Sequence, residues 1–153
     1  GENKSINLKE KKWEIKELEE QEILNFLQQK IIKSDTTQNW SNLLNHCLSD
    51  KKNIVGLNIS GKDIPHLEII CNSSNNVFNA KTLFINIEEG TSASISQINI
   101  GDKNSALSTS SYLNIGKNSV INHGIISFGK NKSHIINTLN VWQDKNSEYN
   151  LGS

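Results

Sequence analysis

Four histidine and cysteine side chains are the first candidates for chemistry in this sequence, because imidazole and thiolate groups are common ligands of zinc and related metals. His46 and Cys47 are adjacent, and His66 and Cys71 are five residues apart. Neither pair has the spacing of a zinc motif, and Cys47 falls on the apolar face of an expected helix. Buried thiols in a reducing compartment are the simpler interpretation. We therefore assign no metal ligand.

Other catalytic arrangements have no support in the sequence. The serines belong to a repeat, so no Ser/His/Asp arrangement can be singled out. Gly116 and Gly129 are isolated turn glycines and do not form a phosphate-binding loop. His123 and His134 occupy different positions of the repeat and are expected at the surface or at strand ends. We assign no catalytic and no cofactor-binding residue, and we expect that the chain is not an enzyme.

The element that would position any site is a fourteen-residue repeat. Its equivalent positions are Thr91, Ser105, Ser119, Ser133 and Ser147. Lys-Asn precedes the serine in three of the repeats, and the fourth, residues 130–133, is interpreted as carrying one inserted Lys. A second column is apolar throughout and contains Ala93, Leu107, Ile121, Ile135 and Tyr149. Self-similarity at a short period is typical of a solenoid, in which each unit buries its apolar face against the next.

The composition of each unit predicts a strand. Ile, Val, Thr, Ser and Tyr suit a pleated strand, and apolar residues do not recur at the spacing of a helix. The apolar phase is expected to shift within each unit, since Gln97 and Ser111 stand at one position and Ile98 and Tyr112 at the next. Stacked strand–turn units predict a parallel β-helix. Turn signals at this spacing also fit a β-sandwich, but the strict register favours the β-helix.

Two regions are expected along the chain. Residues 1–50 form an N-terminal helical segment, and residues 51–153 form a β-helix core that is incomplete at its C-terminal end. Within the first region, apolar residues at 23, 24, 27 and 31 share one helical face behind an acidic first turn. Trp13 and Ile15 predict a short strand or a docked segment, and a second helix is expected from Trp40 to Leu48. Strands are predicted at 54–59, 67–71 and 82–87.

The charge balance narrows the classes of partner. Sixteen basic and sixteen acidic residues cancel, so no global field attracts nucleic acid or an anionic membrane. No apolar run approaches the roughly 20 residues that cross a bilayer, and no signal peptide opens the chain. We expect a cytoplasmic protein with no nucleic-acid and no membrane partner.

One stretch resembles a known family. Residues 81–95 read as a basic residue, an apolar strand, Glu88-Glu89-Gly90 and a strand of small and apolar residues. This pattern, preceded by Trp40-Ser41-Asn42-Leu43-Leu44-Asn45 and by residues 64–69, resembles the SufB/SufD family of iron–sulfur cluster assembly proteins, and SufD more than SufB. The similarity extends from about Trp13 to the end of the chain, and the order and spacing of the motifs carry it.

The resemblance implies a scaffold subunit with a right-handed parallel β-helix flanked by helical segments. Its partners would be a SufB-like subunit and a SufC-like ATPase, and the complex would handle iron–sulfur clusters and ATP, while this fragment holds no cofactor. The Cys and His residues that the family uses for cluster assembly lie beyond the end of this chain, so none is carried over. The fragment is also expected to form a homodimer through exposed β-helix edges.

Two other classes of function stay open. One is a self-associating structural β-helix of the filament or adhesive type. The other is a carbohydrate-active β-helix, which would require clustered carboxylates or a row of aromatic residues. Asp102, Asp144 and Glu148 do not form such a cluster along the sequence.

Overall fold

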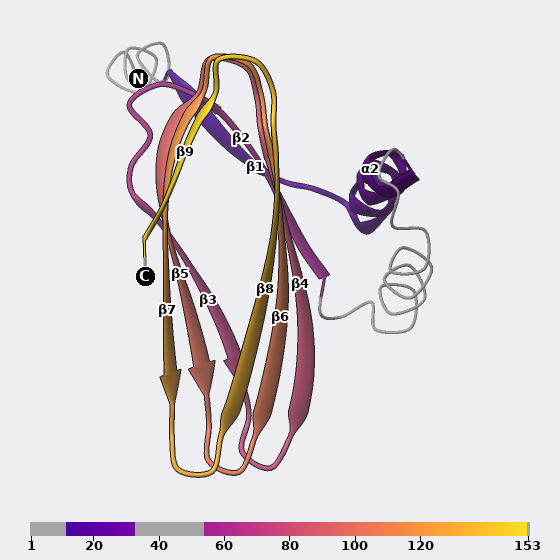
Figure 1. Ribbon diagram of the computed structural model, residues 1–153, viewed down its shortest axis with the longest axis vertical. Coiled ribbons are helices and arrows are strands. Elements are labelled where there is room, and N and C mark those ends of the chain that lie inside the picture. Colours follow the sequence, from indigo (N-terminus) through magenta and orange to yellow (C-terminus); the bar gives the residue numbers. More distant parts are fainter. Residues whose placement is uncertain (1–11, 33–53, 153) are drawn as a thin grey trace, which may run out of the picture.

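The computed structural model describes residues 12–32 and 54–152 (Figure 1). Within these residues the chain forms one helix, α2 (Glu20–Ile32), and a series of strands. The strands are β1 (Trp13–Glu17), β2 (Ile54–Gly61), β3 (Leu67–Ser73), β4 (Phe78–Ile87), β5 (Ser92–Gly101), β6 (Ala106–Ile115), β7 (Val120–Gly129), β8 (His134–Gln143) and β9 (Glu148–Gly152). The helix and the strands expected in these ranges are confirmed. The second predicted helix, Trp40 to Leu48, lies outside the described residues.

Two sheets face each other and are joined by turns at both ends (Figure 1). Sheet A has the strand order β1-β2-β4-β6-β8, and sheet B has the order β3-β5-β7-β9. Apart from β1, which runs antiparallel to β2, every strand pairs in parallel with the next strand of its sheet. Phe78 pairs with Ala106 and Ala106 with His134, so equivalent residues are 28 apart.

One coil of the solenoid therefore contains two of the fourteen-residue repeats, one in each sheet. The coils build a parallel β-solenoid of about four turns, which confirms the predicted β-helix. The β-sandwich alternative is wrong, because the strands of such a sandwich are antiparallel. No helix in the described part of the chain is long and apolar enough to cross a membrane.

The turns explain the period of the repeat. A left-handed backbone conformation, with φ between 54° and 71°, recurs every fourteen residues at Asn76, Gly90, Asn104, Asn118, Lys132 and Asn146. Gly and Asn adopt this conformation more readily than other residues. Three serines that follow this position close their turns: Ser105, Ser133 and Ser147 Oγ donate to the carbonyl oxygen three residues earlier, at 2.6 Å for Ser133. Lys132 occupies the position that Asn occupies in most of the other turns. The fourth repeat therefore carries Lys in place of Asn, and the predicted insertion of one Lys is wrong.

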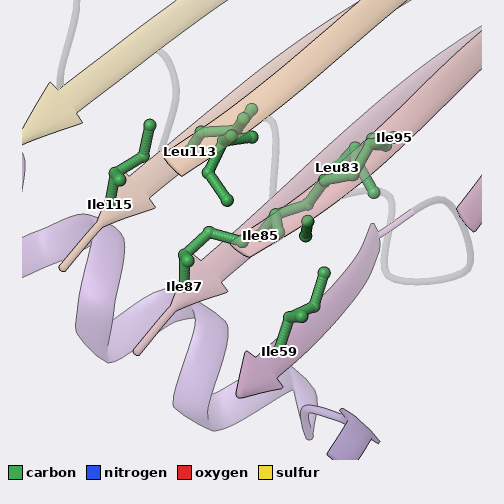
Figure 2. Packing of buried hydrophobic residues seen from close by; sticks show 9 residues of the cluster. Ile59, Leu83, Ile85, Ile87, Ile95, Leu113 and Ile115 are labelled. Carbon is green, nitrogen blue, oxygen red and sulfur yellow. The ribbon is translucent and has the colours of Figure 1, made fainter. Parts of the chain in front are cut away.

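The apolar core lies between the two sheets, towards one end of the coils. It consists of buried side chains from both sheets that stack from coil to coil (Figure 2): Ile59, Leu83, Ile85, Ile87, Ala93, Ile95, Leu113, Ile115 and Ile121. Each fully buried Ile or Leu stabilises the fold by about 1.5–3 kcal/mol relative to an exposed one. A single 28-residue coil cannot enclose this core, so stability depends on stacking.

Helix α2 covers part of the outer face of sheet A. Ile23, Leu24 and Leu27 pack against the outward-pointing Phe84 and Tyr112. The helix lies very close to β2, because a Cβ added at Gly56 would be 2.5 Å from Ile23 Cγ1 and Cδ1. The Leu18 backbone N–H, just before α2, donates to the Gly56 carbonyl oxygen at 2.8 Å. The N-terminal part of the chain thus fixes one outer face of the solenoid.

Candidate functional site

The candidate metal ligands that the structure describes do not come together. His66 lies on the outer face of sheet B, where its Nδ1 and Nε2 are 2.9 and 2.8 Å from Ser94 Oγ and Ser96 Oγ. Cys71 is buried and points into the coil. His46 and Cys47 lie outside the described residues. In residues 12–32 and 54–152, no three His, Cys, Asp or Glu side chains are grouped in a way that could hold a metal ion.

The environment of Cys71 makes its thiol unreactive. Burial raises the pKa of the Cys71 thiol, and the positive charge of Lys81 opposes this rise only in part. A thiol that stays protonated is a poor nucleophile and a poor metal ligand. Cys71 therefore behaves as a buried apolar side chain, as the sequence predicted.

His123 is not at the surface, which corrects the prediction made for it. Its side chain is 1% exposed inside the solenoid, and Nδ1 lies 2.8 Å from the Tyr149 hydroxyl. Nε2 has no hydrogen-bond partner among the described residues. Burial lowers the pKa of His123 to about 4 and raises the pKa of Tyr149 to about 12. Both groups are neutral near pH 7, so this pair does not exchange protons there.

Buried amides and hydroxyls fill the coil beyond the apolar core. Gln97 Nε2 donates to Asn99 Oδ1 and to Asn137 Oδ1, both at 3.2 Å. Ser111 Oγ donates to Gln97 Oε1 at 3.1 Å, and Thr109 Oγ1 donates to Asn99 Oδ1 at 3.4 Å. Buried polar groups are tolerated when they are hydrogen-bonded in this way. The network links successive coils and fixes their register.

This network overturns the expected phase shift within each repeat. Gln97 and Ser111 are fully buried and point inward, and their neighbours Ile98 and Tyr112 point outward. The strands alternate without interruption along their length. The sequence pattern was misleading because polar side chains can point inward when they find hydrogen-bond partners. The partners of Gln97 include Ser111 and Asn137, which come from other strands.

The outer face of sheet B carries regular columns of side chains. Because the coils are stacked in register, side chains 28 residues apart form columns across the strands. One column, which we call the polar column, contains His66, Ser94, Asn122 and Asn150. Asn150 Nδ2 donates to Asn122 Oδ1 at 3.0 Å. Such ladders hold adjacent strands together, and the four side chains of the polar column carry no negative charge.

Beside the polar column lies a shallow channel floored by Ser96, Gly124 and Gly152, which we call the glycine channel. A Cβ added at Gly124 or Gly152 would meet no atom within 4 Å. Neither glycine has a positive φ. The fold itself therefore does not require glycine at these two strand positions. Glycine inside a strand often marks a place where a ligand or another backbone approaches closely.

On the other side of the channel stands an apolar column, the isoleucine ridge, formed by Ile70, Ile98 and Ile126. Ile70 and Ile126 are 58% and 45% exposed. Ile100 and Phe128 follow as the next column, and Phe128 is 58% exposed. The fourteen-residue pattern alone does not reveal this surface. With a coil length of 28 residues, the isoleucines at 70, 98 and 126 align in one column.

The fold and this surface define the class of the protein: a parallel β-solenoid in which a helix partly covers one outer face and no described segment covers the other. Comparison of the chain with protein-family models, curated proteins and solved structures finds no match. A functional assignment therefore rests on the geometry described above and on the resemblance in the sequence.

Proposed function

We propose that the chain is a non-catalytic scaffold subunit of a cytoplasmic iron–sulfur cluster assembly complex of the SufBCD type. The observation that supports this proposal is the parallel solenoid itself, preceded by a helical element. This is the architecture that the SufB/SufD resemblance implies. Residues 81–95, which carry the resemblance, form most of β4, the turn and the start of β5. Gly90 takes the left-handed position of that turn with φ of 71°.

In this proposal the chain supports chemistry that takes place on other subunits. A SufB-like subunit and a SufC-like ATPase would supply cluster assembly and ATP hydrolysis, and iron–sulfur clusters would be the cargo of the complex. The described residues fit a supporting role, because the Cys71 thiol is held protonated and His123 is enclosed. What this chain contributes is a rigid surface of regularly spaced side chains.

Co-purification tests the proposal. The tagged natural gene product should retain a SufB-like subunit and an ATPase through gel filtration, and its deletion should lower the activity of cellular iron–sulfur enzymes. A variant with Lys132→Asn, altered only at an exposed turn, serves as the matched control and should retain both partners. If the full-length protein binds neither subunit and its loss leaves iron–sulfur enzymes unaffected, the proposal is wrong.

A self-associating structural β-helix is the second candidate, and the isoleucine ridge favours it. The carbohydrate-active alternative gains nothing from the described residues. Asp102 lies in a turn after sheet B, 3.5 Å from Lys130 Nζ, whereas Asp144 lies in a turn after sheet A. These carboxylates are therefore at opposite ends of the coil and cannot act as a pair.

A further inference from the structure

We propose that the outer face of sheet B is a self-association surface, on which a second copy of this chain packs sheet against sheet around the isoleucine ridge. This inference goes beyond the proposed function and does not depend on it. It also differs from association through the terminal strands β8 and β9, because it uses the face of a sheet and leaves its edges free.

The chemistry of the face supports self-association. Strands with one face in water normally place polar residues on that face, yet Ile70, Ile98, Ile126 and Phe128 all point outward here. The exposed apolar residues are contiguous over three coils, and such patches mark interaction surfaces. The strands of this face contribute no Lys or Arg to it. A strongly acidic partner, such as nucleic acid, therefore has nothing to bind.

The shape of the face is self-complementary. In β7, Gly124 lies two residues before Ile126 and Phe128 lies two residues after it, all three pointing outward. A two-fold axis along the isoleucine ridge therefore places Phe128 of one copy over Gly124 of the other. The same operation in β5 places Ile100 over Ser96. The large side chain and the empty position occur on the same face at equal distances from the axis, as a self-complementary interface requires.

The same axis avoids a charge conflict. Glu68 of β3 pairs in register with Ser96. Its side chain therefore lies in the same column as the glycine channel, one strand before Ser96. Across the two-fold axis it would face Asn72, which lies at the same distance from Ile70 on the other side. The carboxylate would therefore meet an amide and not a second carboxylate, and an amide can donate a hydrogen bond to it.

The size of the face fits a weak interface. Strands β3, β5, β7 and β9 contain 7, 10, 10 and 5 residues. At about 3.3 Å per residue and about 4.8 Å between strands, they give a face of roughly 500 Å² per copy. A pair would bury roughly 1,000 Å² in total, the size of a weak specific interface. We therefore expect a dimer with a dissociation constant on the order of micromolar.

Sedimentation velocity of the full 153-residue chain, from below to well above micromolar concentration, tests the proposal. The wild-type chain should change from monomer to dimer over this range. Ile126→Lys should remain monomeric, because two copies of the charge would be buried next to each other on the axis. Ile136→Lys is the matched control, since Ile136 is a 63% exposed isoleucine on the outer face of sheet A, and it should dimerise like the wild type.

Gly124→Val gives an independent test, because it separates association from folding. A Cβ added at Gly124 meets no atom within 4 Å, and a β-branched residue suits a strand, so the monomer should be at least as stable as wild type. The valine would occupy the space that Phe128 of the second copy needs. Dimerisation should weaken at least tenfold. Combining Gly124→Val with Phe128→Ala should recover part of the affinity, because the smaller side chain relieves the conflict across the axis.

A wild-type chain that stays monomeric at the highest concentration would overturn the proposal. So would a dimer that Ile126→Lys and Gly124→Val leave intact, a result that would point to the terminal strands β8 and β9 instead. Neither result bears on the proposed role in iron–sulfur assembly, which is decided by binding of the SufB-like subunit and the ATPase. Ile126→Lys should retain both of those partners if the two surfaces are separate.

Discussion

The two sheets of this solenoid are built from the same repeat, but their outer faces differ. On sheet A, Phe84 and Tyr112 point outward and are 0% and 7% exposed, because α2 lies over them. On sheet B, Ile126 and Phe128 also point outward and are 45% and 58% exposed. Ile126 occupies the position of the repeat that Phe84 and Tyr112 occupy, so apolar side chains at one position of the repeat are buried on sheet A and exposed on sheet B.

The difference shows that the repeat places apolar residues on both outer faces, and that the described segments of the chain cover part of one of them. The helix that covers sheet A comes from outside the repeat, and Gly56 lets it approach closely. On sheet B the glycines make room in a similar way, yet no described segment fills the space above Gly124. Gly56 and Gly124 therefore differ. Gly56 makes space for a packed helix, whereas no described segment packs above Gly124.

The largest effect should come from the two phenylalanines. Phe84→Ala removes a side chain that is fully buried under α2 and should lower the free energy of unfolding by about 3–5 kcal/mol. Phe128→Ala removes an exposed side chain and should change it by less than about 1 kcal/mol. Urea unfolding at submicromolar concentration, where the chain is monomeric, measures both. Equal losses for the two variants would mean that the face of sheet B is covered as well.

Acid should test the inner side of sheet B, where His123 lies next to the glycine channel. Burial lowers the pKa of His123 from 6.5 to about 4. Between these pH values the unfolded chain binds a proton that the folded chain does not, so stability falls as the pH falls. The loss should reach up to about 3 kcal/mol near pH 4.

The control for this prediction is His123→Gln, which keeps a polar partner for the Tyr149 hydroxyl and has no group that titrates. Carboxylates also titrate below pH 5, so the difference between wild type and variant carries the result. That difference should grow as the pH falls from 6.5 to about 4 and stay constant at lower pH. A pH profile identical in the two proteins would show that His123 becomes protonated freely and is not enclosed.

The glycine pair should respond with opposite signs. Gly56→Ala places a methyl group 2.5 Å from Ile23 Cγ1 and Cδ1, so the Ile23 side chain or α2 must move, at a cost of about 1–3 kcal/mol. Gly124→Ala meets no atom and reduces the conformational entropy of the unfolded strand, so it should stabilise the monomer by about 0.5–1 kcal/mol. Thermal and urea unfolding of the two variants measure the signs. Destabilisation by both substitutions would remove the contrast between the faces.

The smallest effect concerns the turn that leads from sheet B to sheet A. Lys132 holds a φ of 59°, a conformation that Asn adopts more easily than Lys. Lys132→Asn should therefore stabilise the chain by about 1 kcal/mol or less. Lys117→Asn, at a turn position without a positive φ, is the control and should change stability by less than about 0.5 kcal/mol. A larger gain for Lys117→Asn than for Lys132→Asn would contradict the left-handed conformation of Lys132.

Much of the fold could be predicted from local pattern. The Asn and Ser of each turn have a direct local cause, since the left-handed position and the side-chain hydrogen bond that closes the turn involve residues only a few positions apart. The helix over residues 20–32 could be predicted for the same reason. His123 was misplaced because its burial depends on Tyr149 and on neighbouring coils, which no local pattern reveals.

The candidate surface could not be predicted from local pattern at all. Its columns combine residues 28 apart, and a period of fourteen fits one repeat per coil as well as two. Only the pairing of the strands decides between these, and it places Ile98 beside Ile126 and Ser96 beside Gly124. The inward position of Gln97 was likewise hidden, because its partners Asn137 and Ser111 come from other strands.

The sequence by itself thus determined the period, the turns, the strands and the class of fold, because each of these depends on contacts within a few residues. The tertiary structure alone decided which side chains face inward, how two repeats close one coil and which outer face α2 covers. These depend on the stacking of segments 28 or more residues apart and on a helix that returns to β2 from outside the repeat. The two kinds of apolar position, sealed at Phe84 and open at Phe128, look alike in the sequence and differ only in what lies above them.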